Sequence, residues 1–179
     1  MSERIILTGS ISERIVQALT YAGWYPERKV DIKTIENYYR QFGLTLNDKA
    51  NLFLAEYYGI KSKWYIEVSI LDHGADFEFD LFPYSKAYGI DVVDFMFDDA
   101  EYKLESHEYT NVLQFAPEGS NPILVGEIGY YYPARVWIDT NGKIYATHEY
   151  NENVLVFESV IELIEHELTG HDFSSVAMK

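Results

Sequence analysis

The chain has 179 residues, of which 47% are hydrophobic and 16% aromatic, so it can bury a core without disulfides or metal ions. It carries 14 Lys and Arg against 29 Asp and Glu, and the resulting net charge of −15 would repel nucleic acid and anionic membrane surfaces. It has no cysteine, which excludes disulfides, thiolate metal sites and a cysteine nucleophile. The same charge would attract a basic protein, with solubility alone as the alternative explanation.

The first third of the chain is predicted to be helical. Ser10 to Glu13 has the form of a capping box, and the helix that it begins should end at Gly23. A second helix is expected from Asp31 to Gly43 and a third from Asn47 to Gly59. The apolar residues of the three helices recur at helical spacing: Ile15, Val16, Leu19 and Ala22; Ile32, Ile35, Tyr38, Tyr39 and Phe42; Ala50, Phe53, Leu54 and Tyr57.

Residues 5–7 form an apolar run too short for a signal peptide, and no stretch approaches the ~20 apolar residues that cross a bilayer. These two observations predict a cytoplasmic protein with no membrane partner.

From Lys63 the apolar period changes to two, which predicts a hairpin that turns at Asp72 to Gly74. One face of its first strand carries Trp64, Ile66, Val68 and Ile70. On the return strand we expect Phe77, Phe79 and Leu81 or Phe82 to face the core, and Asp76, Glu78 and Asp80 to face away from it.

Residues 83–119 show no sustained period, although residues 91–102 suit a helix or an irregular strand. Three strands are expected at residues 123–128, 134–138 and 143–150, the last two joined by a hairpin turn at Asp139 to Gly142. A closing helix, ended by Gly170 before a polar tail, should present one apolar face: Val154, Phe157, Val160, Ile161, Ile164 and Leu168.

This element order predicts an α+β fold, a mainly antiparallel β-sheet with N-terminal helices and a C-terminal helix packed against it. No repeat, low-complexity tract or linker is visible, so we expect a single domain over residues 1–179 rather than two small ones.

Patterns typical of catalysis are weak, so we expect no enzyme, no catalytic residue, no cofactor and no bound metal. His166 and His171 flank a glutamate as in a zinc-protease helix, but at this spacing their side chains project about 140° apart. A glycosidase would need a carboxylate pair in an apolar setting that raises one pKa, and no pair stands out in this way. The sequence contains no Gly-x-Ser-x-Gly elbow and no phosphate-binding glycine motif.

Acidic residues are concentrated between Asp72 and Glu108. This fifth of the chain holds eleven Asp and Glu against Lys86 and Lys103, with aromatic residues of the kind that anchor interfaces among them. The pattern predicts a surface for a basic protein partner, with a solvated acidic loop over a core edge as the alternative. The expected contact residues are Asp72, Asp76, Glu78, Asp80, Asp94, Asp98, Asp99 and Glu101.

Three stretches give the chain a family resemblance: Ala22 to Arg28 (AGWYPER), Ile123 to Gly129 (ILVGEIG) and Val136 to Tyr145 (VWIDTNGKIY). The chain resembles the SUKH superfamily, specifically the third of its named families, which contains immunity proteins of bacterial polymorphic toxin systems. The closing helix from Ser159 to Leu168 also fits, and the similarity extends over most of the chain.

The resemblance implies a single SUKH-like domain that acts as an antitoxin, binding and neutralising a protein toxin that is often a nuclease. This suits the charge, because an acidic surface can occupy a basic nuclease cleft in place of nucleic acid. A non-catalytic regulatory scaffold of the same superfamily, and an enzyme, are the alternatives. Gly23-Trp24 and Gly126-Glu127 match recurrent family positions; we expect a helix stop and a strand end there, with Glu127 also a candidate for binding.

Overall fold

The computed structural model describes residues 3–41, 43–61, 63–68, 73–81, 107–130, 132–148 and 151–178. Their helices are α1 (Ile11–Ala22), α2 (Lys33–Gln41), α3 (Asp48–Tyr57), α6 (His107–Phe115) and α7 (Val160–Glu167). Their strands are β1 (Arg4–Ile6), β2 (Lys63–Val68), β3 (His73–Leu81), β4 (Ile123–Tyr130), β5 (Ala134–Ile138), β6 (Ile144–His148), β7 (Asn151–Phe157) and β8 (Ser175–Met178). Predictions for Phe42, Ile70, Phe82 and residues 91–102 fall outside the described residues.

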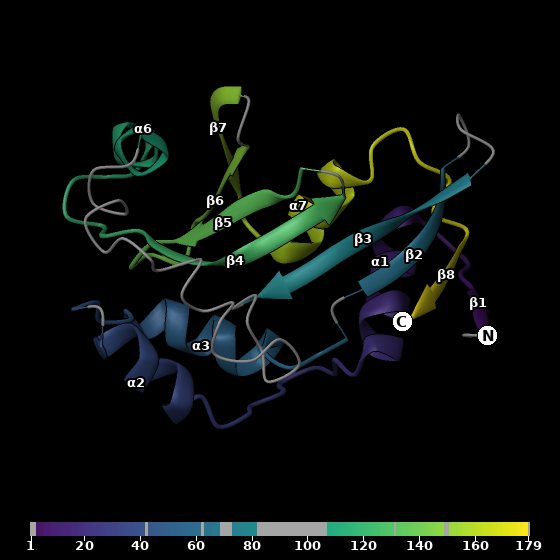
Figure 1. Ribbon diagram of the computed structural model, residues 1–179, viewed down its shortest axis with the longest axis horizontal. Helices are drawn as coiled ribbons and strands as arrows, with labels where there is room; N and C mark the ends of the chain where they lie inside the picture. The colour runs from purple at the N-terminus through teal and green to yellow at the C-terminus, as the bar shows by residue number, and fades with distance from the viewer. Residues whose placement is uncertain are drawn as a thin grey trace.

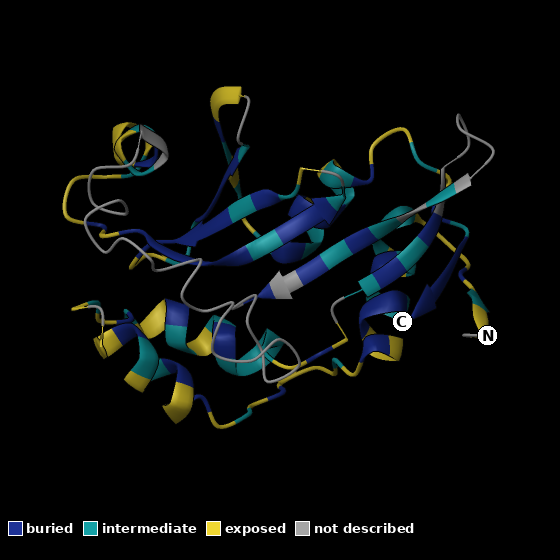
Figure 2. Ribbon diagram, in the orientation of Figure 1, coloured by how far each residue is buried: buried dark blue, intermediate teal, exposed yellow. Residues whose placement is uncertain are grey.

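The described strands form one sheet in the order β1-β8-β2-β3-β4-β5-β6-β7, and every neighbouring pair is antiparallel (Figure 1). The predicted α+β class, an antiparallel sheet with helices packed against it, is therefore confirmed. Buried residues line the sheet along its length, while the helices expose their outer sides (Figure 2). No helix among the described residues is long and apolar enough to cross a membrane.

The three N-terminal helices form where their capping signals predicted them. The Ser10 hydroxyl accepts a hydrogen bond from the Glu13 backbone N–H, and the Glu13 carboxylate accepts one from the Ser10 N–H at 2.7 Å. Helix α1 then ends at Gly23, whose φ of 108° is left-handed. The Asn47 side chain caps α3 in the same way by accepting from the Ala50 N–H at 2.8 Å.

The hairpin β2–β3 buries Trp64, Ile66, Phe77, Phe79 and Leu81 as predicted. The predicted turn is wrong at two positions, because His73 pairs with Val68 and Gly74 with Glu67 inside the hairpin. Gly74 is needed there for close packing: its N–H donates to the Tyr65 hydroxyl at 3.0 Å, and a Cβ at Gly74 would lie 2.2 Å from the Tyr65 ring.

The closing helix is shorter than predicted and begins after Ser159, whose hydroxyl accepts from the Glu162 N–H at 3.2 Å. Residues 151–157 form β7 instead, paired with β6. Leu155 and Phe157 pack against the main core, and Val154 belongs to a second cluster on the other face. A strand that is apolar on both sides lacks the alternation that identifies strands in a sequence.

The predicted polar tail is also wrong. Strand β8 lies between β1 and β2, and all four of its residues are buried. Phe173, just before it, is 1% exposed and stacks on Trp64 with ring centroids 6.5 Å apart. The segment escapes prediction because its apolar residues are few and are interrupted by serines.

The sheet has an apolar cluster on each face. The main core lies under α1, α2, α3 and α7 and includes Ile15, Ile35, Leu54 and Leu163. On the other face, α6 packs over β6 and β7 and closes the second cluster: Val112, Leu124, Trp137, Tyr145 and Val154. Among the described helices, α6 packs over the β6–β7 end of this face. Over β2 to β5 the same face carries charged side chains.

Candidate functional site

Among the described side chains of β2 to β5, five charged ones share the face of the sheet that carries α6. They belong to four neighbouring strands and alternate with residues buried in the main core. We call them the charged sheet face: Lys63 of β2, Asp76 and Glu78 of β3, Glu127 of β4 and Arg135 of β5.

Two of the eight predicted contact residues have described side chains, and both lie on the charged sheet face. Asp76 and Glu78 are partly exposed neighbours along β3. Asp80 also lies in β3, where its backbone is opposite Glu127, but its side chain is outside the description. The remaining five predicted contact residues lie outside the described residues: Asp72, Asp94, Asp98, Asp99 and Glu101.

Glu78 and Glu127 of the charged sheet face each have a basic neighbour on the adjacent strand. Lys63 Nζ lies 3.6 Å from Glu78 Oε1, and Arg135 Nε lies 3.7 Å from Glu127 Oε1. The four side chains are between 25% and 40% exposed, so each pair contributes at most about 1 kcal/mol to stability. Lys63 and Arg135 lie outside the acidic segment of the sequence, which is why counting charges along the chain missed them.

The predicted strand end at Glu127 is wrong. Strand β4 continues to Tyr130, and the pairing with β5 shifts by one residue between Leu124 and Gly126, which marks a bulge. Glu127 therefore lies in mid-strand, on the charged sheet face and beside Arg135.

The stretch from Ala22 to Arg28 has a structural role in this fold. Trp24 stacks on Tyr57 and donates its indole N–H to Glu56 Oε1 at 3.0 Å. Arg28 is 8% exposed and donates to the Glu56 carbonyl oxygen at 2.7 Å. Burial lowers the pKa of the Arg28 guanidinium from its usual value. The stretch therefore connects the turn after α1 to α3. Gly23 ends α1 and the Trp24 indole is packed, as predicted.

The histidines near the end of α7 have separate partners. His166 lies against Phe157, His171 lies edge-on to Tyr130 at 4.4 Å, and His148 Nε2 lies 3.0 Å from Glu167 Oε1. Within the described ranges, no three His, Asp or Glu side chains are grouped as a metal site would require.

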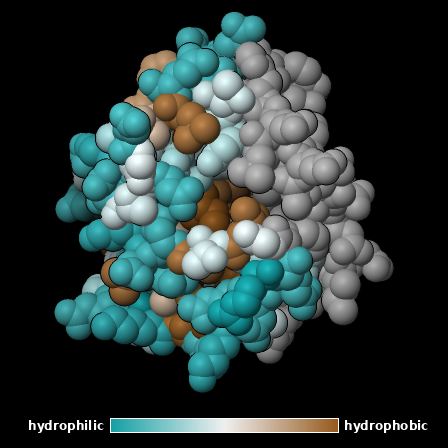
Figure 3. Space-filling view, turned by 90° about the vertical axis from the view of Figure 1, so that its left-hand side faces the viewer, coloured by the Kyte–Doolittle hydropathy of each residue, from teal (hydrophilic) through white to brown (hydrophobic). Residues whose placement is uncertain are grey.

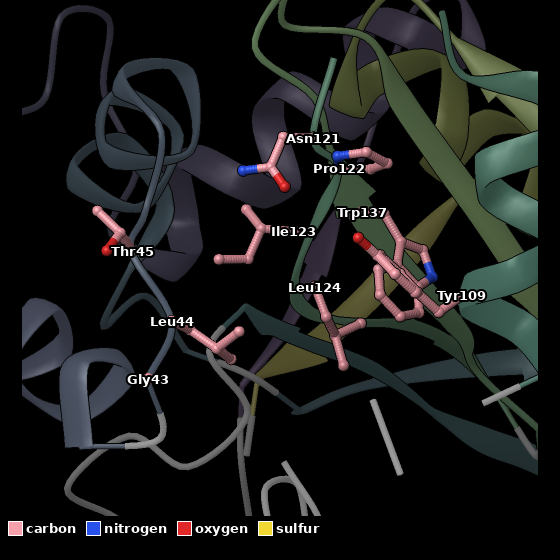
Figure 4. A pocket seen from close by; sticks show the side chains of 9 residues that line it. All are labelled: Gly43, Leu44, Thr45, Tyr109, Asn121, Pro122, Ile123, Leu124 and Trp137. Atoms are coloured by element: carbon pink, nitrogen blue, oxygen red, sulfur yellow. The ribbon is translucent and has the colours of Figure 1, made fainter. Parts of the chain in front are cut away.

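A small pocket opens where four segments meet at the end of the sheet beside α2 and α6. It has a volume of about 190 Å³ and lies between the α2–α3 loop, α6 and the adjoining ends of β4 and β5. Figure 3 views this end of the molecule and shows hydrophobic residues gathered near its centre, in a hollow with hydrophilic residues beside it. Figure 4 shows Leu44, Ile123 and Leu124 around the hollow, with Tyr109 and Trp137 together at one side.

Sequence reasoning missed this pocket because its lining comes from residues 43–45, 109, 121–124 and 137. Residue 109 belongs to a helix that the sequence did not predict. Among the lining residues, Asn121 has a left-handed backbone with φ of 46°, which the sequence does not indicate.

Comparison with curated proteins and comparison with solved structures each give no match. The family model described as SUKH-3 immunity protein matches residues 11–166. The match includes α1, most of the sheet and almost all of α7, and it covers the three stretches that carry the resemblance. The chain therefore belongs to the SUKH-3 immunity protein family.

Proposed function

We propose that the protein binds a cognate toxin of a bacterial polymorphic toxin system and neutralises it by covering the active cleft of the toxin. The observation that carries this proposal is the family match over residues 11–166. In this mode the protein acts by binding, without catalysis and without a cofactor, and one immunity protein inactivates one toxin molecule. Neutralisation takes place in the cytoplasm, where a toxin that attacks nucleic acid would find its substrate.

We further propose that the toxin is a basic nuclease domain. A nuclease cleft holds phosphates with Lys and Arg, so a protein of net charge −15 is drawn to it electrostatically. Such attraction raises the association rate and weakens as salt shortens the screening length. The proposal thus predicts a complex whose formation is salt-dependent.

The proposed contact surface comprises the eight acidic residues named from the sequence, Asp72, Asp76, Glu78, Asp80, Asp94, Asp98, Asp99 and Glu101. Support comes from the partly exposed side chains of Asp76 and Glu78, which share one face of the sheet. Lys63 and Arg135 on the same face would give a partner charges of both signs to match, which favours one orientation of docking.

The test is coexpression of this protein with the toxin domain encoded beside its gene, followed by copurification at low and at raised salt. We expect growth to be rescued and the complex to weaken by at least about tenfold between 50 and 500 mM salt. Rescue without salt dependence would support the immunity function but contradict the proposed electrostatic contact. Neither rescue nor binding would contradict the proposed function itself.

The location of the contact surface is tested by charge reversal. The triple variant Asp94→Lys, Asp98→Lys, Asp99→Lys should weaken toxin binding by at least about tenfold at low salt. The matched control is Glu3→Lys, Glu152→Lys, Asp172→Lys, which changes the net charge equally at three exposed positions outside the acidic segment. Equal affinities of the two triple variants would place the contact elsewhere.

A further inference from the structure

The sheet ends in two edge strands, β7 beneath α6 and β1 at the opposite end (Figure 1). Strand β7 has seven residues and β1 has three. An edge strand turns every second pair of its backbone N–H and C=O groups away from its one neighbour, so an extended segment of another protein can pair with it and lengthen the sheet. The residues whose backbone points outward follow from the strand pairing.

The backbone directions in β6 follow from the hairpin before it. The Asp139 N–H donates to the Lys143 carbonyl oxygen at 3.1 Å across the β5–β6 hairpin. In an antiparallel sheet, the backbone groups of successive residues point to opposite neighbours. Lys143 and Tyr145 therefore point to β5. Ile144 and Ala146, which alternate with them, point to β7.

The pairing of β6 with β7 then identifies the outward-pointing residue of β7. Leu155 and Phe157 lie opposite the two residues of β6 that point to β7, so their own backbone groups face β6. Val156 lies between them, and its N–H and C=O therefore point to the open edge. No described strand pairs with β7 on that side. By the same alternation, Val154 also points outward.

The open stretch of β7 is limited to residues 154–157. Before it, the Asn153 N–H donates to Asn151 Oδ1 at 3.0 Å, and after it the Glu158 N–H donates to Glu162 Oε2 at 2.9 Å. Between these points the sequence has neither proline nor a charged residue. Proline and charge are the usual means by which proteins block pairing at an exposed sheet edge, so this stretch is left able to pair.

The same stretch presents apolar side chains on both faces of the sheet. Val156 is 47% exposed, and Leu155 and Phe157 are partly exposed where they lie against the main core. Successive side chains of a strand point to opposite faces, so Val156 lies on the face that carries α6. An added strand would cover all three side chains, and this burial would add to the backbone hydrogen bonds.

Acidic side chains lie at both ends of the open stretch. Glu152 is exposed within β7, in the part of the strand that Figure 2 shows exposed. Glu158 has a side chain 69% exposed and pairs with Lys143, and Glu162 lies beside it. Three acidic residues thus stand against one basic residue. A segment with apolar residues in its middle and Lys or Arg at its ends is complementary to this edge.

We propose that an extended segment of the toxin pairs with β7 at residues 154–156 as an added strand, with apolar residues beside Val156 and Lys or Arg beside Glu152 and Glu158. This inference rests on the proposed function. The backbone of Val156 provides hydrogen bonds that hold the segment, and the acidic residues at the two ends select a basic one.

The opposite edge of the sheet provides a matched control. The Leu7 N–H donates to the carbonyl oxygen of the residue before β8 at 2.8 Å, so Leu7 faces β8 and Ile6 faces the open edge. Ile6 is 68% exposed. The groove beside β1 has a net positive charge, from Arg4, Lys61 and Glu3. This edge therefore resembles β7 in its outward apolar residue but does not attract a basic segment.

Proline substitution tests the pairing at each edge. Val156→Pro removes an N–H that points outward and leaves the backbone groups of Leu155 and Phe157 facing β6. Ile6→Pro removes the corresponding N–H on β1. The melting temperature of each purified variant is compared with that of the unmodified protein. Toxin affinity is then measured by titration calorimetry at low salt.

We expect Val156→Pro to weaken toxin binding by at least about tenfold and Ile6→Pro by less than about twofold. If Val156→Pro weakens binding no more than Ile6→Pro does, the proposed strand addition is wrong. If Val156→Pro does not fold, the pair Val156→Lys and Ile6→Lys decides by the same comparison. These two variants change the net charge equally, and only the lysine on β7 would repel the basic segment.

Amide hydrogen exchange provides a second measurement on the unmodified protein. The outward N–H of Val156 should exchange at least about tenfold more slowly in the toxin complex than in the free protein, while exchange at Ile6 stays the same. Unchanged exchange at Val156 in a saturated complex would overturn the strand addition and leave the immunity function standing. Absence of toxin binding by the unmodified protein would contradict both proposals.

Discussion

A single carboxylate organises the hairpin between β5 and β6. Asp139 is completely buried, and its side chain accepts from the backbone N–H groups of Asn141 and Lys143 at 2.8 and 2.9 Å and from the Tyr145 hydroxyl at 3.0 Å. Gly142 takes the left-handed position with φ of 87°. Burial, together with the hydrogen bond to Asp139, raises the pKa of Tyr145 to about 12.

Replacing Asp139 by alanine should destabilise the protein by about 3 kcal/mol, because three buried or partly buried donors lose their acceptor. The measurement is urea unfolding followed by circular dichroism. Thr140→Ala is the matched control, since Thr140 is exposed in the same turn, and it should change the unfolding free energy by less than about 0.5 kcal/mol. Similar stabilities of the two variants would show that the Asp139 contacts are dispensable.

At the scale of elements, prediction succeeded where the signal was local. Ser10 with Glu13, and Asn47 alone, are capping residues that act within one helical turn, and both helices begin where these residues indicate. Prediction failed where burial on both sides decides the structure. Val154 and Phe157 lie at helical spacing from Val160, but pairing with β6 makes them part of a strand.

The same reasoning explains how much of the candidate site was predictable. The alternation along β3 placed Asp76 and Glu78 on one face correctly. Their basic neighbour Lys63, and the pair of Glu127 with Arg135, depend on the order and register of the strands. The pocket requires the docking of α6, which no local pattern in residues 83–119 indicates.

The connection between β4 and β5 depends on Gly129. Its φ is 139°, and a Cβ there would lie 2.9 Å from Glu167 Oε2 and 3.1 Å from Pro133 Cα. Gly129→Ala should therefore destabilise the protein by about 3 kcal/mol in urea unfolding. Gly119 also has a positive φ but open space around it, so Gly119→Ala should cost only about 1 kcal/mol. The difference between the variants reports the steric contact together with the less permissive φ of Gly129, and a difference of zero would exclude both effects.

At the scale of the whole molecule, the two ends of the described chain complete the sheet together. Strand β8 pairs with β1 on one side and β2 on the other, with Arg4 opposite Ala177 and Trp64 opposite Met178. Phe173 leads into β8 and packs in the main core. The stability of the protein therefore depends on residues that sequence patterning assigned to a polar tail.

Phe173→Ala should lower the free energy of unfolding by about 3 to 4 kcal/mol, because it removes a fully buried ring that stacks on Trp64. The matched control is the same substitution at Phe115, which is 55% exposed on α6 and should cost less than about 1 kcal/mol. Both are measured by urea unfolding monitored by tryptophan fluorescence. Equal effects at the two positions would contradict the central place of β8.

The insertion of β8 between β1 and β2 also sets an order of events during synthesis on the ribosome. The strands from β2 to β7 can pair in sequence as they emerge, since each lies beside the next one along the chain. Strand β1 must wait for a partner that is translated at the other end of the described chain. Pairing across such a separation is slow, and the nascent chain keeps an open sheet edge at β2 until then.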